Sequence, residues 1–265
     1  MPIADNGQIR LHYETSGIAS GEVLVLSNSL GSSLHMWDKV VPRLESTYQI
    51  VRYDTRGHGV SSIPPAPYTI EQLGRDVLFL LDHLGIERVN VCGLSLGGMV
   101  AMWMGIHAPQ RVRRMVLANT GARIGTVEMW NQRIAAAQNS GMAFLAAAIL
   151  ERWFTSSFRN QQPAEMEAIR SMIAATDPNG YIACCGVLRD TDLRADISAI
   201  SAPALVITGT HDPATPPSNG RAIYAAVRNS KYVELDSSHL SAWERADQFA
   251  DAVIAFLGGE EPGNG

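Results

Sequence analysis

Short runs of apolar residues, separated by stretches with a helical pattern, predict a sheet with helices on both faces. The clearest run is residues 23–27 (VLVLS), which is apolar until its last residue. An uninterrupted run of this kind is typical of a parallel strand that is covered on both sides. Further strands are predicted at residues 48–53, 89–92, 114–119, 204–209 and 231–235. Since helical patterns separate these strands, we expect a mostly parallel sheet.

Two segments depart from this alternation. Residues 8–14 (QIRLHYE) alternate polar and apolar positions, as expected for an antiparallel edge strand or the arm of a hairpin. Residues 123–192 are helical in pattern throughout and rich in alanine, methionine and aromatic residues. We expect this segment to form a lid over the carboxyl edge of the sheet, where ligands bind in such folds. The predicted division is therefore a core of residues 1–122 and 193–265 and a lid of residues 123–192.

Composition and charge narrow the classes of protein to which the chain can belong. Its 265 residues, 46% of them hydrophobic, suffice for one globular domain with an insertion. The formal net charge of -5 argues against nucleic acid or an anionic membrane surface as the partner. The amino terminus has no secretory pattern, no apolar run reaches membrane-spanning length, and three cysteines do not suit a disulfide framework. We therefore expect a cytoplasmic protein with reduced thiols and without a metal or organic cofactor.

Residues 87–109 (ERVNVCGLSLGGMVAMWMGIHAP) carry the strongest chemical signal. A strand is predicted before Gly93-Leu94-Ser95-Leu96-Gly97 and an apolar helix after it. A strand, a sharp Gly-x-Ser-x-Gly turn and a helix form a nucleophile elbow, in which the turn exposes the serine hydroxyl above the sheet edge. The pentapeptide alone is a weak signal, because glycine and serine are common residues. Its placement between a strand and a helix is what favours Ser95 as a nucleophile.

A serine hydroxyl needs a base that takes its proton. Among the seven histidines of the chain, His239 is favoured because it lies in a short polar loop after the last predicted strand. That is the expected position of the base when the order along the chain is Ser, Asp, His. His211, which also follows a late strand, is the weaker alternative.

The base in turn needs an acid that holds its tautomer. Asp212 follows the strand at residues 204–209 and is the predicted acid, although an Asp-Pro pair is also typical of a turn. Asp236 lies on the same loop as His239, where it can simply shape that loop. Asn119, at the end of the strand after the elbow, cannot supply a carboxylate.

Backbone N–H groups complete the predicted site by binding the oxyanion that forms when a carbonyl is attacked. One donor is expected from Leu96, at the start of the helix after the elbow. The second is expected from the small polar loop after residues 23–27. Leu30 is the favoured donor there, and its neighbour Ser29 is the alternative and a predicted substrate contact.

Residues 54–59 (DTRGHG) form a glycine-rich turn that also contains charged residues. A phosphate cradle needs a Gly-Lys-Ser/Thr ending or a Gly-x-Gly-x-x-Gly run after a strand, and neither is present. We expect Asp54, Arg56 and His58 to brace neighbouring loops by ion pairs and hydrogen bonds.

Several particular stretches of the sequence, taken together, resemble one family. They are LSNSLG at 26–31, YDTRGHG at 53–59, ANT at 118–120 before ARIGT at 122–126, RWFT at 152–155 and GTHD at 209–212. Along nearly its whole length the chain resembles the α/β-hydrolase superfamily, and more narrowly the 3-oxoadipate enol-lactonases of bacterial aromatic catabolism. The resemblance implies an α/β-hydrolase fold, with a mostly parallel eight-stranded sheet flanked by helices and an inserted helical lid.

The same resemblance implies a reaction. The expected activity is hydrolysis of 3-oxoadipate enol-lactone, a small anionic lactone of the beta-ketoadipate pathway, to 3-oxoadipate through an acyl-enzyme on Ser95. The substrate carboxylate requires a cation, preferably a forked one. Among the lid arginines Arg123, Arg133 and Arg152 we favour Arg133, with Trp130 and Trp153 as apolar walls. The alternative without a role in substrate binding is that the arginine is solvated and the two tryptophans belong to the core.

Two other classes of function remain open at this point. The first is another small-ester, thioester or carbon-carbon bond hydrolase with the same triad, in which the lid arginines would be dispensable. Dehalogenases and epoxide hydrolases are disfavoured because those relatives usually carry an aspartate where Ser95 stands. The second class is a small-molecule receptor on a hydrolase fold, which would stall after one turnover. The sequence carries no signal for an oligomeric state.

Overall fold

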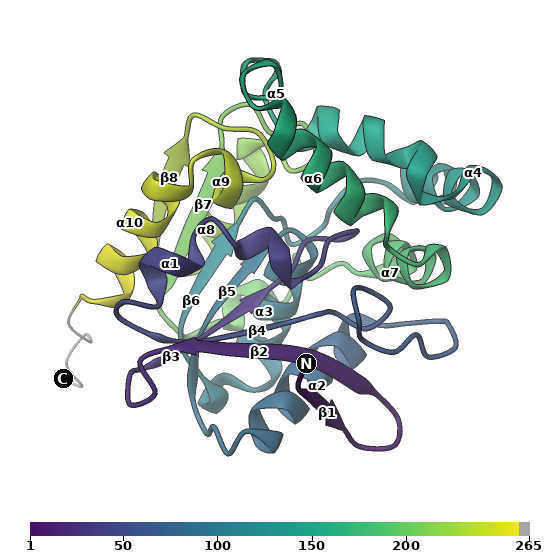
Figure 1. The fold of residues 1–265 in the computed structure, drawn as a ribbon. Helices are drawn as coiled ribbons and strands as arrows, with labels where there is room; N and C mark the ends of the chain where they lie inside the picture. Colours follow the sequence, from purple (N-terminus) through teal and green to yellow (C-terminus); the bar gives the residue numbers. More distant parts are fainter. Residues whose placement is uncertain (260–265) are drawn as a thin grey trace.

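A single eight-stranded sheet forms the centre of the computed structural model, which describes residues 1–259 (Figure 1). The strand order is β1-β2-β4-β3-β5-β6-β7-β8. The strands are β1 (Ile3–Asp5), β2 (Arg10–Gly17), β3 (Val23–Ser27), β4 (Gln49–Tyr53), β5 (Val89–Leu94), β6 (Val112–Ala118), β7 (Ala204–Gly209) and β8 (Ser230–Leu235). Strand β2 pairs antiparallel with β1 and β4, and the pairs from β4 through β8 are parallel. The expected mostly parallel eight-stranded sheet is confirmed.

The apolar runs of the sequence form the central strands because these strands are covered on both faces. Every residue of β5 and β7 is buried, whereas β2, which pairs with the edge strand β1, and the edge strand β8 consist mostly of half-buried and exposed residues. Helices α1 (Val41–Leu44) and α10 (Ala246–Leu257) cover the face that is turned to the viewer in Figure 1. Helices α2 (Ile70–His83), α3 (Leu96–His107) and α8 (Pro217–Ala226) cover the other face.

Local sequence signals fix where helix α2 begins and ends. The Thr69 hydroxyl accepts a hydrogen bond from the Gln72 N–H, and the Gln72 side chain accepts one from the Thr69 N–H, as the predicted capping box requires. At the other end Gly85 has φ of 68°, a left-handed conformation that stops the helix. Helix α3 differs in having no polar stripe: its residues from Leu96 to Gly105 are buried, so it lies inside the molecule and carries the elbow at its start.

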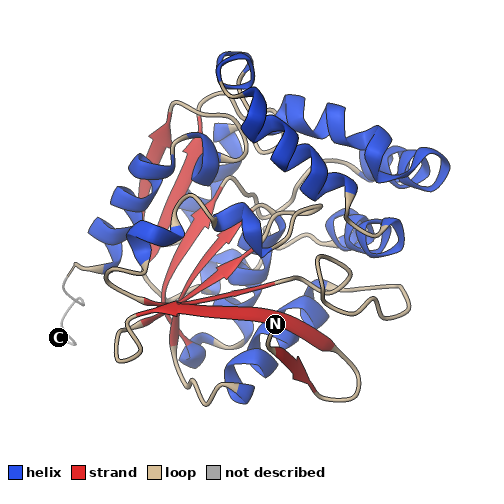
Figure 2. Cartoon of the chain, viewed as in Figure 1, coloured by secondary structure: helices blue, strands red, loops and turns tan. Residues whose placement is uncertain are grey.

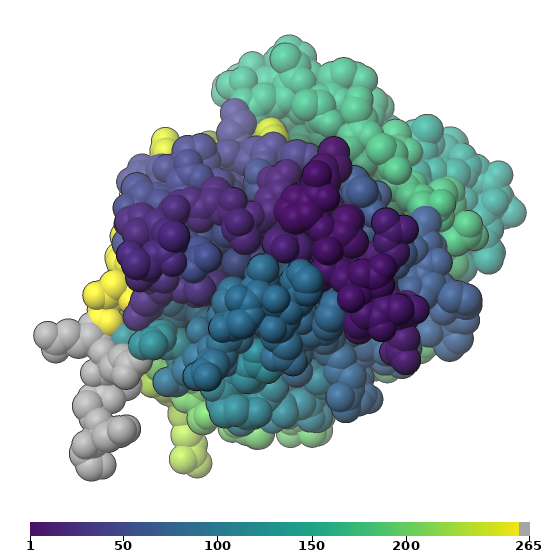
Figure 3. All heavy atoms as spheres, turned by 60° about the horizontal axis from the view of Figure 1, so that its bottom comes forward, coloured from purple at the N-terminus to yellow at the C-terminus, as the bar shows by residue number. Residues whose placement is uncertain are grey.

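Four helices form the segment between β6 and β7. They are α4 (Val127–Trp153), α5 (Ser156–Gln161), α6 (Pro163–Ala174) and α7 (Pro178–Asp190). In Figure 2 these helices lie together beyond the carboxyl ends of the strands, as expected for an inserted lid. The space-filling view in Figure 3 shows the same helices, in teal and green, as a layer beyond the purple N-terminal strands. The end of the predicted core, residues 260–265, lies outside the described residues.

Helix α4 bears on the expectation that no apolar run reaches membrane-spanning length. Among residues 1–259 it is the helix that is long and apolar enough to cross a membrane by length and composition, with a mean hydropathy of 1.2 over 18 residues. Its backbone is broken at Gly141, which has φ of 70° and ψ of 177°. Each of the two stretches beside Gly141 is shorter than the roughly 20 residues that a membrane-spanning helix needs.

All three cysteines are free thiols inside the protein. Cys92 lies on β5, and Cys184 and Cys185 lie on α7 of the lid. Burial raises the pKa of each thiol, to about 12 for Cys185. The reactive thiolate is therefore disfavoured at all three positions.

Candidate active site

The turn between β5 and α3 has the strained geometry of a nucleophile elbow. Ser95 has φ of 59° and ψ of -114°, a backbone conformation that side-chain-bearing residues rarely adopt. A Cβ atom at Gly93 would lie 2.1 Å from the Gly97 carbonyl oxygen, and one at Gly97 would lie 2.0 Å from the Ser27 carbonyl oxygen. Only glycine therefore fits at either position, as the sequence predicted. The turn places Ser95 on the wall of a cavity beneath the lid.

The loops after β7 and β8 bring Asp212 and His239 together. The Nδ1 atom of His239 lies 2.8 Å from Oδ2 of Asp212, and both side chains are buried. Since Nδ1 faces a carboxylate, the hydrogen bond assigns its proton there and leaves Nε2 as the nitrogen that can accept a proton. His239 lines the same cavity as Ser95. The structure thus places the three residues of the predicted triad in one region.

The Asp212 carboxylate is held by five hydrogen bonds. Its Oδ1 accepts from the N–H groups of Ala214 (2.8 Å) and Thr215 (3.0 Å). Its Oδ2 accepts from the Thr215 hydroxyl (2.6 Å) and the Asn119 amide (3.0 Å), besides His239. Burial raises the pKa of Asp212, but the His239 charge and the hydrogen bonds from His239 and Thr215 lower it by more. The carboxyl group is therefore charged and fixed in orientation at neutral pH.

Asn119 is a residue that sequence reasoning dismissed and the structure places next to the acid. It follows β6 with φ of 42°, and its amide also donates to the Ser238 carbonyl at 3.2 Å. Its own side-chain oxygen accepts a hydrogen bond from the Ser241 hydroxyl. The available signal was a polar residue at the carboxyl end of a buried strand, next to the strand that leads to Asp212.

The loop after β3 supplies the candidate oxyanion donors. The N–H of Ser29 donates to Sδ of Met36 at 3.1 Å, and the N–H of Gly31 donates to Nε2 of His58 at 3.0 Å. These contacts favour the N–H of Leu30, which lies between them, over that of Ser29. Leu30 and Ser29 both line the cavity, and Leu96 begins α3 beside Ser95.

The residues at 54–58 brace this loop, as the sequence indicated. The Asp54 carboxylate accepts hydrogen bonds from the N–H groups of Leu34 (2.8 Å) and Val60 (2.9 Å). Arg56 forms two 2.6 Å hydrogen bonds with Asp76. Burial lowers the pKa of His58, whose ring also contacts the Arg56 carbonyl. A neutral His58 is required, because its Nε2 accepts the Gly31 N–H.

The cavity encloses about 300 Å³, at the lower end of the range for small-molecule sites. The four predicted substrate-binding residues Ser29, Trp130, Arg133 and Trp153 line it, whereas the predicted oxyanion donor Leu96 is not among its lining residues. The lining residues are Ser29, Leu30, Ser95, Ile124, Met129, Trp130, Arg133, Arg152, Trp153, Leu188, Pro213, Ala214 and His239. Apolar lid side chains therefore form one wall, and Ser95 and His239 lie on another.

Two arginines, rather than one, face the cavity. Arg133 donates through Nε to the Tyr181 hydroxyl, and its guanidinium lies 5.5 Å from the ring centre of Trp130. Arg152 was considered from the sequence but not chosen, and it also lines the cavity. Burial and the nearby charge of Arg133 lower the pKa of Arg152. Arg123 is instead paired with Asp192 at 3.2 Å. Two cations in a partly apolar cavity favour an anionic ligand.

A metal site is not formed by the described residues. Within residues 1–259 no three histidine, cysteine, aspartate or glutamate side chains are grouped so that they could hold a metal ion. The chemistry that the cavity supports directly is nucleophilic attack by Ser95 on a carbonyl group, with His239 as the base.

Comparison with known proteins agrees with this geometry. The family model for the alpha/beta hydrolase fold matches residues 22–246. The chain is 38% identical over 249 residues to 3-oxoadipate enol-lactonase 2 of Acinetobacter baylyi, covering 94% of this chain and 93% of that protein. The solved enol-lactonase from Burkholderia xenovorans LB400 is 44% identical, with a TM-score of 0.96 and coverage of 97% and 100%. A thermophilic esterase from Thermogutta terrifontis is 27% identical, with a TM-score of 0.88 and coverage of 94% and 93%.

Proposed function

This chain belongs to the α/β-hydrolase fold family and is a carboxylic ester hydrolase, and we propose that its substrate is 3-oxoadipate enol-lactone. The observation that carries this proposal is that Arg133 and Arg152 both line the cavity that contains Ser95. A neutral ester gives no use for two partly buried cations, whereas a carboxylate-bearing lactone binds both. The similarity to enol-lactonases supports the same substrate.

The proposed reaction begins with attack of the Ser95 hydroxyl oxygen on the lactone carbonyl, while Nε2 of His239 takes the hydroxyl proton. The N–H groups of Leu30 and Leu96 bind the oxyanion, and Asp212 stabilises the charged imidazolium. Collapse of the tetrahedral intermediate breaks the ring C–O bond and releases an enolate. The enolate takes the proton from Nε2 of the His239 imidazolium and tautomerises to the ketone, which leaves an acyl-enzyme on Ser95 and a neutral His239.

In the second half of the proposed reaction, water attacks the acyl-enzyme. His239 takes a proton from the water and returns it to the Ser95 oxygen as 3-oxoadipate is formed. The opened chain stays attached to Ser95 between the two steps, so the cavity has to hold both ends of the molecule. Trp130 and Trp153 are the proposed apolar walls for its middle, and Ser29 is a proposed contact near the carbonyl.

We place this activity in the beta-ketoadipate pathway and in the cytoplasm, with the small anionic lactone as the partner and no nucleic acid or membrane. The three buried free thiols support a reducing compartment. The net charge of -5 supports a small-molecule rather than a nucleic-acid partner.

The first experiment compares steady-state hydrolysis of freshly prepared 3-oxoadipate enol-lactone with that of p-nitrophenyl acetate, and Ser95→Ala is the control. We expect kcat/KM to be higher for the lactone by at least about 10³ and to be lost in the variant. If the simple ester is hydrolysed better, the hydrolase assignment stands and the lactone is not the substrate.

The arginine pair has its own test. Arg133→Ala and Arg152→Ala should each raise KM for the lactone by about tenfold or more, because each removes a charged partner of the carboxylate, and leave KM for p-nitrophenyl acetate unchanged. Arg123→Ala, which removes a lid arginine that is paired with Asp192, is the matched control. Equal effects on both substrates would remove the carboxylate role.

A second candidate is a hydrolase of small neutral esters, thioesters or carbon-carbon bonds. It is supported by the apolar part of the cavity wall, which includes Ile124, Met129 and Leu188, and by the likeness to the Thermogutta esterase. A hydrolase-fold receptor is the remaining class. Sustained turnover of either substrate, rather than a stall after one equivalent, excludes it.

A further inference from the structure

Glu244 is a buried carboxylate that joins the loop of His239 to the lid. It ends α9 (Ser241–Glu244), five positions after His239, and is 4% exposed. Its Oε2 accepts the Ser238 N–H at 2.9 Å. On its other side it accepts the Thr155 N–H, at 3.3 and 3.4 Å to the two oxygens, and the Thr155 hydroxyl. We call this set of contacts between Ser238, Glu244 and Thr155 the Glu244 bridge.

Two further hydrogen bonds run in parallel with the Glu244 bridge. The Ser238 hydroxyl donates to the Arg152 carbonyl at 2.7 Å, and the Leu240 N–H donates to the Trp153 carbonyl at 2.9 Å. Ser238 and Leu240 are the immediate neighbours of His239. The residues on either side of the base are thus bonded to the backbone of two residues that line the cavity, Arg152 and Trp153.

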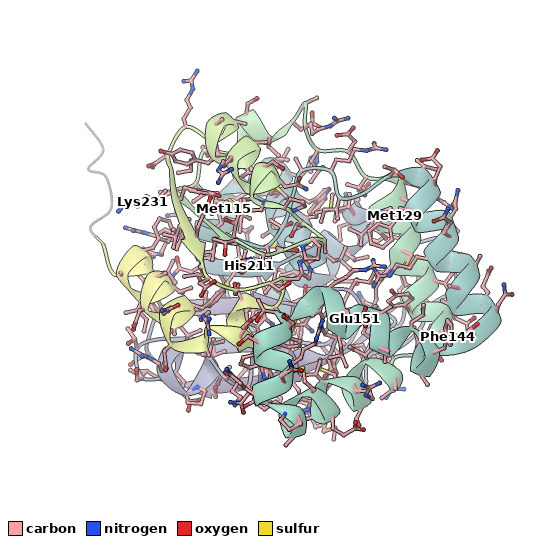
Figure 4. All side chains as sticks on the ribbon, turned by 90° about the horizontal axis from the view of Figure 1, so that it is seen from above. Met115, Met129, Phe144, Glu151, His211 and Lys231 are labelled. Carbon is pink, nitrogen blue, oxygen red and sulfur yellow. The ribbon has the colours of Figure 1, made fainter. Side chains whose placement is uncertain are left out.

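The break at Gly141 divides α4 into two parts with different attachments. The first part carries Arg133, whose Nε donates to Tyr181 on α7. The second part ends at Arg152 and Trp153, beside the loop of His239. In Figure 4 this second part runs from Phe144 at the outer rim, past Glu151, toward the loop that carries His211. A Cβ at Gly141 would meet nothing within 4 Å, so glycine is favoured there by its positive φ and not by packing.

We propose that Glu244 is a positioning residue that sets the separation between the base His239 and the anion-binding guanidinium of Arg152. The inference rests on the roles proposed above for His239 and Arg152. In the lactone the carboxylate is attached on the enol side of the ester bond, through a rigid ring. The distance between the attacked carbonyl and the carboxylate therefore varies little, and the protein has to match it. The KM for a neutral ester does not depend on this distance, because such an ester has no carboxylate to contact Arg152.

Glu244→Gln tests the proposal with little change in shape. Glutamine removes the negative charge, keeps one acceptor oxygen and replaces the other with an NH₂ group, so the two positions can no longer accept both the N–H groups at Oε2 and the Thr155 hydroxyl at Oε1. The matched control is Glu165→Gln. Glu165, on α6, also ties the lid to the core, by accepting from Lys39 and from Trp243 at 2.6 Å each, and neither hydrogen bond involves residues 238–240.

The substrates are chosen to differ only in charge. They are 4-acetoxybenzoate, whose carboxylate is on the leaving group as in the lactone, and its neutral methyl ester. For Glu244→Gln we expect KM for 4-acetoxybenzoate to rise about tenfold, with KM for the methyl ester unchanged and kcat reduced for both. Glu165→Gln should leave the ratio of the two KM values at the wild-type level. Circular dichroism is used to check that both variants are folded.

Two results would overturn the proposal. One is an unchanged KM ratio in folded Glu244→Gln, and the other is the same change of ratio in Glu165→Gln; either would make Glu244 an ordinary structural carboxylate. If Glu244→Gln does not fold, Glu244→Asp takes its place, because the side chain shortened by one methylene group keeps its charge but cannot reach both Ser238 and Thr155. An unchanged KM ratio in that variant likewise rejects the proposal.

The experiment also separates this inference from the proposed function. If wild-type protein hydrolyses 4-acetoxybenzoate but not the enol-lactone, the lactone is wrong and the Glu244 bridge is still tested. If the lactone is the substrate and the KM ratio does not respond, only the positioning role fails.

Discussion

The described part of the chain, residues 1–259, contains two buried histidine-aspartate pairs with nearly the same geometry. In one, Nδ1 of His239 lies 2.8 Å from Oδ2 of Asp212, and in the other, Nδ1 of His12 lies 2.8 Å from Oδ2 of Asp54. Both carboxylates also accept backbone N–H groups. Distance and burial therefore do not distinguish a candidate catalytic pair from a structural one.

The difference lies at the other ring nitrogen. His239 lines a cavity that it shares with Ser95, the proposed nucleophile. Nε2 of His12 is buried without a hydrogen-bond partner among the described residues. The His12-Asp54 pair joins β2 to the loops at 34 and 60, and neither residue lines the cavity that contains Ser95. The two pairs therefore differ in what surrounds the Nε2 atom, the ring nitrogen that does not contact the carboxylate.

The largest expected effect is on the pair that faces Ser95. Asp212→Asn should lower kcat by about 10⁴, because an amide at this position holds the His239 tautomer with the proton on Nε2. The measurement is steady-state hydrolysis of p-nitrophenyl acetate by folded protein. A loss smaller than about tenfold would show that Asp212 is not the acid.

The same change in the second pair should act on stability. Asp54→Asn weakens a buried group that contacts His12, Leu34 and Val60, and we expect it to lower the free energy of unfolding by about 3 kcal/mol. Urea denaturation measures this loss, and kcat of the folded fraction should stay near the wild-type value. If kcat fell as far as in Asp212→Asn, the distinction between the two pairs would be wrong.

The next prediction adds a carboxylate beside the His239–Asp212 pair. Asn119→Asp places an acid where an amide now lies 3.0 Å from Oδ2 of Asp212. Two carboxylates at this distance cannot both be charged cheaply, so the pair should retain a proton and the apparent pKa of the acid limb of kcat/KM should rise. At pH 6 we expect a loss of about tenfold that recovers toward pH 9. Asn119→Gly, which allows the same positive φ, is the control and should not shift the pH profile.

The smallest effect concerns His58, a buried histidine whose ring contacts a backbone carbonyl in place of a carboxylate. Burial lowers its pKa below the ordinary 6.5, so the folded state resists protonation that the unfolded state accepts. Its contribution to stability is therefore complete above pH 6.5 and declines as the pH falls toward the folded-state pKa. The urea midpoint should fall between pH 7.5 and pH 5.5, and less so in His58→Gln. If the urea midpoint declines equally in the wild-type protein and in His58→Gln, His58 does not account for this pH dependence.

Asp212 contributes in a separate pH range. Since its pKa is lowered, its contribution to stability is present above its ordinary 3.8 and is lost as the pH falls further.

The sequence was most informative where the backbone itself creates the geometry. A sheet with this alternation brings the loops after β5, β7 and β8 to one edge, so Ser95, Asp212 and His239 could be predicted to approach one another. Their catalytic roles stay predictions until the variants are measured. The elbow glycines could be predicted for the same reason, because the clash at Gly93 and Gly97 depends only on the turn.

Side-chain partners across elements were not predictable in the same way. Asn119 looked irrelevant because it lacks a carboxylate, and only the neighbouring positions of β6 and β7 show that its amide reaches Asp212. In the lid, the break at Gly141 resets the helical phase, so the period of α4 could not indicate that Arg133 and Arg152 face the same cavity. Strand β1 was missed because three residues carry no period.

The three protected thiols give the protein an internal reporter of how its layers open. A labelling reagent reacts with thiolate, and burial disfavours that form at every cysteine. Modification of Cys92 therefore requires the central sheet to open, whereas modification of Cys184 or Cys185 requires only that α7 part from its neighbours. The ratio of the two labelling rates, with and without a bound anion, measures the opening of the lid separately from global unfolding.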